Sequence, residues 1–184
     1  MQLIGNPLLE NYLRDDWTWE NMMIRPTFSW AIPDEKAIQL ISKYSPIIEI
    51  GAGRGYWAKL ISETGADILA FDLFPPNKEA RNFFHHAPGL YFPVAKGGAA
   101  TVKKHPNRTL FLCWPPYDTP MALQTVKAFK GTHVIYIGEG SGGCTGCDKF
   151  HSYLEKHFDE VETYSIPQWF GIHDYMSVHK RKCD

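Results

Sequence analysis

Three alternate glycines directly after a short apolar segment constrain this chain more than any other feature. Residues 47–50 are apolar except for Glu49, and Gly51, Gly53 and Gly55 follow them. Glycine lets the backbone turn tightly after a strand, and it lets a ligand approach the main chain closely. The pattern therefore predicts a buried strand that ends in a nucleotide-type cofactor loop and is followed by a helix.

The acid before the first glycine indicates the kind of ligand. Loops that hold a pyrophosphate use the free amides of a helix N-terminus and usually have the spacing G-x-G-x-x-G. This chain has the shorter spacing G-x-G-x-G. The carboxylate of Glu49 opposes a pyrophosphate but suits a ligand with an ammonium and a sulfonium group. The loop therefore favours S-adenosylmethionine, and an NAD-dependent enzyme is the disfavoured alternative.

A second acid ends the next apolar segment, residues 66–72. Asp72 lies about 20 residues after the glycine turn, where nucleotide-binding folds place an acid that accepts hydrogen bonds from ribose hydroxyls. Together the loop and the acid resemble the class I S-adenosylmethionine-dependent methyltransferases, whose first motif is a strand ending E/D-x-G-x-G-x-G. The resemblance implies S-adenosylhomocysteine as the product. The cofactor-binding residues that it implies are Glu49, Gly51, Ala52, Gly53, Gly55, Tyr56, Trp57, Asp72 and Trp114.

Length and alternating patterns predict the fold. The chain has 184 residues, of which 44% are hydrophobic, enough for one α/β core. Helical and strand patterns alternate throughout, which predicts a doubly wound, Rossmann-like α/β fold with a mostly parallel seven-stranded sheet and helices on both faces. We expect a single methyltransferase-like domain over residues 1–184, with a leading helix and lid in 1–45 and a core in 46–184. Strands are predicted at 46–50, 66–72, 91–94, 109–113, 132–137, 161–166 and 175–179.

The helices of this fold are predicted at 34–44, 55–62 and 148–157. A further helix is expected to begin near Pro120, with Asp118 or Thr119 as its cap. The formal net charge of −1 gives no global basic field that would attract nucleic acid or anionic lipid. The N-terminus lacks a charged start followed by an apolar core, and no run approaches membrane-spanning length. We therefore expect a soluble, cytoplasmic protein without a membrane partner; its oligomeric state is left open.

Cysteine usage predicts free thiols, because four cysteines without a secretion signal are poorly explained by a disulfide framework. Cys144 and Cys147 form a C-x-x-C pair, so a zinc or redox site is an alternative, with His151 and Cys183 as candidate completing ligands. No second pair of this kind follows. No metal is predicted.

The residues after the fourth predicted strand carry a second resemblance. Trp-Pro-Pro-Tyr-Asp at 114–118 is similar to the catalytic loop of methyltransferases that act on amino groups. In those enzymes a polar side chain and the first proline's carbonyl accept hydrogen bonds from the target nitrogen, and the aromatic ring stacks on a planar substrate. The catalytic residues that the resemblance implies are Trp114, Pro115, Pro116, Tyr117 and Asp118. Trp114 departs from the pattern because indole is only a donor, which makes methylation of a nucleic acid base less favoured.

Polar and aromatic residues define an expected substrate rim. Asp118, Glu139 after the fifth predicted strand, and His173 are expected on this rim and are candidate proton acceptors. Each also has a structural interpretation, as a helix cap, a loop anchor and a surface histidine respectively. The segment 27–33 is expected to form a lid with Trp30 at the rim. The alternative is that the N-terminal aromatics, Trp17 and Trp19 included, cover the outer helices.

The principal hypothesis is an S-adenosylmethionine-dependent methyltransferase that acts on an unidentified small molecule or protein side chain. Methyl transfer from a sulfonium needs an in-line approach and, for some nucleophiles, removal of a proton. Two alternatives stay open. One is an N-methyltransferase that acts on an amino group of a nucleic acid base, and the other is a non-catalytic S-adenosylmethionine-binding scaffold.

Overall fold

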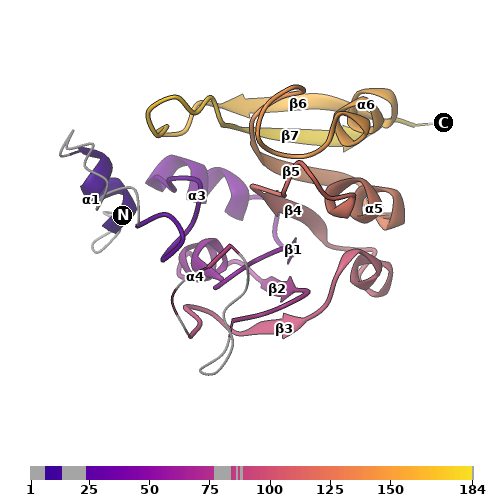
Figure 1. Ribbon diagram of the computed structural model, residues 1–184. Coiled ribbons are helices and arrows are strands. Elements are labelled where there is room, and N and C mark those ends of the chain that lie inside the picture. Colours follow the sequence, from indigo (N-terminus) through magenta and orange to yellow (C-terminus); the bar gives the residue numbers. More distant parts are fainter. Residues whose placement is uncertain (1–6, 14–23, 77–83, 86, 88, 184) are drawn as a thin grey trace.

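The computed structural model describes residues 7–13, 24–76, 84–85, 87 and 89–183 (Figure 1). Trp17, Trp19 and part of the 74–89 crossover lie outside the described residues. The helices are α1 Pro7–Leu13, α3 Glu35–Ser42, α4 Tyr56–Ser62, η1 Ala99–Lys104 (a 3₁₀ helix), α5 Met121–Ala128 and α6 Asp148–His157. The strands are β1 Ile47–Ile50, β2 Ile68–Asp72, β3 Val94–Lys96, β4 Thr109–Cys113, β5 His133–Gly138, β6 Phe158–Tyr164 and β7 Tyr175–Arg181.

The strands form one seven-stranded sheet in the order β3-β2-β1-β4-β5-β7-β6. Strands β1 to β5 pair in parallel, and β7 is antiparallel to both β5 and β6. The predicted mostly parallel, doubly wound sheet is confirmed. The winding reverses between β1 and β4, so the carboxyl ends of β1, β2, β4 and β5 meet at one edge. Because β7 runs the opposite way, its first residues reach the same edge.

Helices cover both faces of the sheet, with α3 and α4 on one side and α5 and α6 on the other (Figure 1). Neighbouring residues of β1 alternate between the two cores: Ile47 packs with the α3 and α4 residues, and Ile48 packs with those of α5 and α6. All four residues of β1 are buried. A parallel strand that is covered on both faces needs such a continuous apolar run.

The leading amphipathic helix is confirmed, over 35–42 within the predicted 34–44. Asp34 is its cap, and its side chain accepts a hydrogen bond of 2.7 Å from the amide of Ala37. This bond satisfies one of the free amides of the first turn. Ala37, Ile38, Leu40 and Ile41 are buried. The helix therefore packs its apolar face on the sheet directly before β1 begins.

Three predicted boundaries were wrong. The third strand spans 94–96 rather than 91–94, because the amide of Tyr91 donates to the carbonyl of Arg54 and ties this residue to the glycine loop. The sixth strand spans 158–164 rather than 161–166, since its pairing with β7 begins at Phe158. Helix α5 has Pro120 in the cap position without a side-chain cap bond, so neither Asp118 nor Thr119 caps it.

The described residues contain no helix with the length and apolar character required to cross a membrane. All four cysteines are free thiols. Within the described part of the chain, no group of three or more His, Cys, Asp or Glu residues is placed to hold a metal ion.

Replacing Phe111 by alanine tests the core. Phe111 is fully buried at the centre of β4, and its ring packs edge-on against Trp57 at a centroid distance of 5.9 Å. We expect Phe111→Ala to lower the free energy of unfolding by about 3–5 kcal/mol, because truncation of a buried aromatic leaves a cavity. Urea denaturation followed by circular dichroism measures the change. Val161→Ala, at a side chain that is 51% exposed, is the control. A loss of less than about 1 kcal/mol at Phe111 would contradict this packing.

Candidate functional site

All three glycines of the loop after β1 adopt left-handed backbone conformations. The φ angles are 81° at Gly51, 54° at Gly53 and 74° at Gly55, a region that favours glycine. Space is also limited, because a Cβ atom on Gly53 would lie 2.1 Å from Nε2 of His85. The amide of Gly51 donates to the carbonyl of Phe71 at 2.8 Å, which fastens the loop to the end of β2.

Glu49 is a buried carboxyl group near the end of β1. Its side chain is 2% exposed, and among the described residues no group forms a hydrogen bond with its Oε2 atom. Burial, followed by the charge of Asp72, raises the pKa of Glu49 to about 8. A buried polar atom without a partner is costly. A cationic ligand would supply both the missing hydrogen bond and the compensating charge.

Asp72 is bonded directly to the glycine loop. Its Oδ2 atom accepts a hydrogen bond of 2.8 Å from the amide of Gly53, and its Oδ1 atom accepts one of 2.8 Å from the amide of Phe74. Burial raises the pKa of Asp72, and these two bonds oppose the increase. Each carboxylate oxygen can accept more than one hydrogen bond. Asp72 therefore keeps capacity for further donors such as the hydroxyl groups of a ribose.

The side chains of Tyr56 and Trp57 are occupied by packing. The ring of Tyr56 lies 5.2 Å from the rings of both Phe28 and Tyr91. The indole Nε1 of Trp57 donates to Oγ of Ser29 at 2.9 Å. These contacts link the N-terminal segment to α4. A cofactor role for Tyr56, Trp57 and their neighbour Ala52 stays a prediction.

Arg54, inside the glycine run, holds two segments over the loop and was not identified from the sequence. Its Nε atom donates to the carbonyl of Gly89 at 2.8 Å, and its Nη1 atom donates to the carbonyl of Thr27. The guanidinium also lies over the ring of Tyr91, 4.4 Å from the centroid. The available signal was a single charged residue between two glycines. Arg54 joins the expected lid segment to the residues around Gly89.

Trp114 has a strained backbone and two defined side-chain contacts. Its φ angle of 51° is the only positive one among the described non-glycine residues, and this conformation is unfavourable for a bulky side chain. Its ring stacks on that of Trp30 at 5.7 Å and 22°. Its Nε1 atom donates to Oδ2 of Asp174 at 2.8 Å. Trp114 therefore connects the expected lid segment with the start of β7.

The rest of the Trp-Pro-Pro-Tyr-Asp loop is attached to the segment after β5. The carbonyl of Pro115 accepts a hydrogen bond of 2.8 Å from the amide of Gly146, and Pro116 forms an antiparallel bridge with Thr145. The next two residues, Tyr117 and Asp118, point into solvent, and Tyr117 is 60% exposed. One side of the loop is thus fixed, while Tyr117 is accessible to a substrate.

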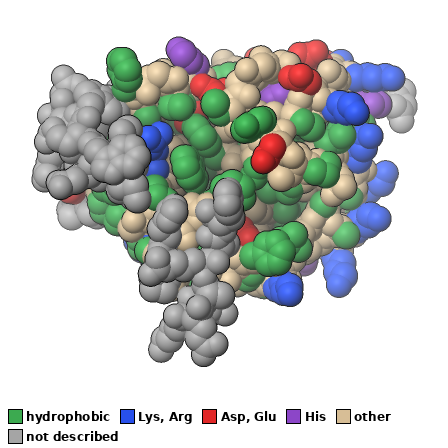
Figure 2. Space-filling view, viewed as in Figure 1, with side chains coloured by type: hydrophobic (Ala, Val, Ile, Leu, Met, Phe, Trp, Pro, Cys, Tyr) green, Lys and Arg blue, Asp and Glu red, His purple; other side chains and the backbone are tan. Residues whose placement is uncertain are grey.

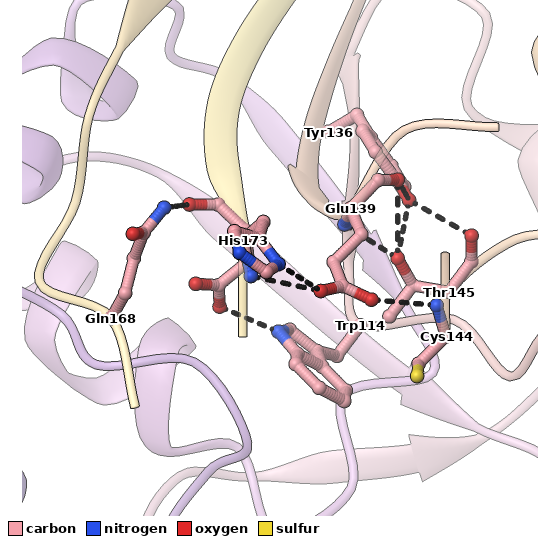
Figure 3. Close-up of polar contacts among 8 residues, drawn as sticks. Trp114, Tyr136, Glu139, Cys144, Thr145, Gln168 and His173 are labelled. Atoms are coloured by element: carbon pink, nitrogen blue, oxygen red, sulfur yellow. Dashed lines mark hydrogen bonds and ion pairs between the residues drawn. The ribbon is translucent and has the colours of Figure 1, made fainter. Parts of the chain in front are cut away.

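Glu139 joins two loops at the ends of β5 and β7 (Figure 3). Its Oε1 atom accepts a hydrogen bond of 2.8 Å from the amide of His173, and its Oε2 atom accepts one of 2.6 Å from the amide of Cys144. Burial raises the pKa of Glu139, but these bonds outweigh it and hold the pKa below its usual value. The imidazole of His173 is 84% exposed. Both carboxylate oxygens of Glu139 are thus engaged in holding loops, as the structural interpretation of this residue expects.

Asp174 is fully buried beside His173 and was missed in the sequence. Burial raises its pKa to about 6, although the hydrogen bond from Trp114 opposes the increase. Its Oδ1 atom has no hydrogen-bond partner in the described part of the structure. The available signal was an acid directly before the last predicted strand. The start of β7 thus brings a second unpartnered carboxyl oxygen to the edge where β1 and β4 end.

The C-x-x-C pair lies beside Glu139. Cys144 is exposed, and burial of its sulfur and the neighbouring Glu139 carboxylate raise the pKa of its thiol. A raised pKa disfavours the thiolate that metal binding and redox chemistry require.

Comparison with solved structures identifies the fold. The chain is similar to magnesium protoporphyrin IX methyltransferase from Synechocystis PCC 6803 with bound S-adenosylmethionine, with a TM-score of 0.54 and 10% identity over 98% of this chain and 93% of that one. It also resembles 1,6-didemethyltoxoflavin-N1-methyltransferase from Burkholderia thailandensis, with a TM-score of 0.53 and 15% identity over 95% and 85% of the two chains. The N-methyltransferase NodS from Bradyrhizobium japonicum WM9 is similar with a TM-score of 0.51 and 12% identity, over 96% of this chain and 98% of that one.

A scan against models of protein families finds no match, and neither does a search of curated proteins. The structural similarity, at 10–15% identity, shows the fold. The chain has the Rossmann-like fold of class I methyltransferases.

The raised pKa of Glu49 predicts a pH dependence of stability. Between its usual value of 4.5 and its folded value of about 8, the folded protein holds a proton that the unfolded chain has released. Stability therefore falls as the pH rises through this range. Glu49→Gln is neutral at every pH, so its melting temperature should rise relative to the unsubstituted protein as the pH increases. Thermal unfolding across this range, with exposed Glu160→Gln as the control, measures the difference. A difference that is independent of pH would contradict the raised pKa.

Proposed function

We propose that this protein is an S-adenosylmethionine-dependent methyltransferase whose cofactor lies on the glycine loop at the end of β1. The observation that carries the proposal is the buried Glu49 carboxyl group, whose Oε2 atom has no partner in the described structure. It lies two residues before a loop of left-handed glycines that is bonded to Asp72. A ligand that combines a cation with a ribose matches both carboxyl groups.

The charge of the site distinguishes S-adenosylmethionine from NAD. Among the described residues, no Lys or Arg forms an ion pair with Glu49 or Asp72. The ammonium and sulfonium groups of S-adenosylmethionine would compensate the negative charge of the Glu49 and Asp72 carboxylates, whereas the pyrophosphate of NAD would add to it. The residues present therefore fit S-adenosylmethionine.

When bound, S-adenosylmethionine supplies an electrophilic methyl group on a sulfonium. Glu49 and Asp72 hold the cofactor in this proposal, and the left-handed glycines let it approach the main chain. The ring of Trp114, on which Trp30 stacks, provides an aromatic surface after β4 that orients the acceptor. Orientation for in-line attack is the main requirement of methyl transfer.

The segment 27–33 acts as a lid in this proposal. Three of its residues make specific contacts with the site: Thr27 with Arg54, Ser29 with Trp57, and Trp30 with Trp114. Each contact pairs the segment with a residue of the glycine loop, of α4 or of the loop after β4. Closure of such a segment would exclude water from the reacting groups.

The similar structures support the cofactor assignment. The magnesium protoporphyrin IX enzyme was solved with bound S-adenosylmethionine, and the toxoflavin and NodS enzymes were solved with S-adenosylhomocysteine. The acceptor in our proposal is a small molecule or a protein side chain. Tight cofactor binding without turnover on any acceptor would instead support a non-catalytic scaffold.

A basic groove keeps nucleic acid as a second candidate acceptor. The groove lies between α5 and α6, has a volume of about 430 Å³, and contains Lys127, Lys149 and Lys156 beside Tyr153 and His157. Lys and Arg side chains gather on this side of the molecule (Figure 2). Within the described structure these three lysines make no ion pair with a carboxylate. Such a groove suits a single strand, with phosphates on the lysines and a base on the aromatic pair.

Salt dependence tests this second candidate. If the groove binds a short labelled single-stranded RNA, changing Lys127, Lys149 and Lys156 to glutamine should reduce the slope of log affinity against log salt by about 2. Lys36→Gln with Lys43→Gln, exposed positions on the α3 side, is the control and should leave the slope unchanged. Fluorescence anisotropy measures binding. Equal slopes in all proteins would remove nucleic acid as a candidate.

Calorimetric titration with Asp72→Ala tests the principal proposal. We expect S-adenosylmethionine to bind the unsubstituted protein, and Asp72→Ala to weaken binding by about 1–3 kcal/mol, the cost of removing a buried hydrogen-bond partner. Asp159→Ala, at a side chain that is 68% exposed, is the control and should bind normally. Unchanged affinity in Asp72→Ala would exclude Asp72 from the site, and binding of NAD in place of S-adenosylmethionine would contradict the proposal.

A further inference from the structure

Two residues in contact with Trp114 carry a buried side-chain atom that has no hydrogen-bond partner among the described residues. Among the described residues, four buried side-chain atoms lack a hydrogen-bond partner: Trp30 Nε1, Glu49 Oε2, Thr119 Oγ1 and Asp174 Oδ1. Trp30 stacks on Trp114, and Asp174 accepts its indole N–H. Buried polar groups are normally paired, so such a group needs an explanation, for which a ligand is one candidate.

Glu49 and Asp174 both lie close enough to Cys113 to affect the pKa of its thiol. The charges of both raise the pKa of the Cys113 thiol, after the larger effect of its burial. Cys113 is the last residue of β4 and directly precedes Trp114. The two carboxyl groups therefore lie on either side of the end of β4, one from β1 and one from the start of β7.

Among the described residues, the Asp174 carboxylate forms no ion pair with Lys, Arg or His. It accepts a hydrogen bond from Trp114; the charge of Glu139 raises the pKa of Asp174, and the charge of the exposed His173 lowers it. Its side chain is fully buried. An isolated buried carboxylate is costly, so a cation at Oδ1 would be stabilising.

The proposed cofactor accounts for Glu49 but not for Asp174. Glu49 lies beside the glycine loop, whereas Asp174 lies on the far side of the β4 end, against Trp114. The neighbouring rings provide a surface that also suits a cation. One such contact is already present, because the guanidinium of Arg25 lies 5.8 Å from the ring centroid of Trp30. We therefore expect a second cationic group, in addition to that of the cofactor, to bind beside Asp174 and the ring of Trp114.

We propose that the methyl acceptor is an amine, whose nitrogen binds beside Oδ1 of Asp174 against the ring of Trp114. This inference rests on the proposed function. Trp30 covers Trp114 in the structure, and in our proposal the amine enters when Trp30 leaves the stack.

Asp174 can accept the proton that the amine must lose before it is methylated. The amine enters as an ammonium and gives one proton to the Asp174 carboxylate, which frees the nitrogen lone pair. The nitrogen attacks the methyl carbon, and the carbon–sulfur bond breaks with its electron pair left on sulfur as a neutral thioether. The product leaves as a methylammonium, and Asp174 returns its proton to solvent. The raised pKa of Asp174, about 6, suits a carboxylate that accepts a proton reversibly.

A matched pair of probes tests the charge requirement. We would titrate protein loaded with S-adenosylhomocysteine with n-butylammonium chloride and with n-butanol, which differ chiefly in charge. The indole N–H resonance of Trp114, assigned with Trp114→Phe, reports binding. We expect butylammonium to bind about ten-fold more tightly than butanol, the effect of one charge-assisted hydrogen bond. Equal affinities in the unsubstituted protein would overturn the proposal.

Two variants separate this role from a purely structural one. Asp174→Asn keeps an oxygen that accepts from Trp114 but removes the charge, so it should lose the preference for butylammonium. Asp174→Glu keeps the charge and should retain part of the preference for butylammonium. A preference that persists in Asp174→Asn would overturn the proposal. Binding of S-adenosylhomocysteine, measured separately by calorimetry, should stay within about two-fold in both variants; its absence in the unsubstituted protein would contradict the proposed function instead.

Product analysis completes the test. The protein is incubated with S-adenosylmethionine that carries a trideuterated methyl group and with separate pools of defined amines, carboxylic acids, phenols and thiols. We expect deuterium only in N-methyl products, with a rate about 100-fold lower in Asp174→Asn, the loss expected when a general base is removed. Deuterated O-methyl or S-methyl products would overturn the assignment of an amine.

Discussion

Buried carboxyl groups without a cationic partner control this site. Glu49 at the end of β1 and Asp174 at the start of β7 each have a buried oxygen that no described residue pairs. A folded protein normally neutralises or pairs such groups, because an uncompensated buried charge is costly. Both pKa values are raised, to about 8 and about 6. The site is therefore suited to ligands that bring positive charge with them.

The sheet topology brings these groups together. Strands β1 and β4 are neighbours at the point where the winding reverses, and antiparallel β7 begins at the edge where they end. This arrangement places Glu49, Trp114 and Asp174 near one another although they are far apart in the sequence. Asp72 is fixed by its bond to the Gly53 amide. Residues of the segment 27–33 contact this edge of the sheet through Arg54, Trp57 and Trp114.

The parts of the site with local signals were predictable from the sequence. Glu49, the three glycines and Asp72 follow apolar strands at recognisable intervals, and the structure joins the loop to Asp72 by a hydrogen bond. The fold class was predictable because apolar runs and helical periods alternate. Strand β6 was misplaced at its start because an exposed edge strand carries charged residues that hide its pattern.

Contacts between distant segments were not predictable. The bond from Trp114 to Asp174 joins residues 60 positions apart, and Arg54 reaches Thr27 and Gly89 through the folded chain. No periodicity records such pairs, because they depend on where loops meet after folding. Likewise, the hydrogen bond from the indole of Trp57 to Ser29 joins α4 to a segment 28 positions earlier.

The most direct test of the account is the number of protons released when S-adenosylmethionine binds. Glu49 is protonated at pH 7 in the ligand-free protein because its pKa is about 8, and a facing ammonium should ionise it. Calorimetric titrations in buffers with different ionisation enthalpies measure this release. We predict release of nearly one proton per cofactor, and none in Glu49→Gln. Binding without proton release in the unsubstituted protein, or no binding, would contradict the central claim.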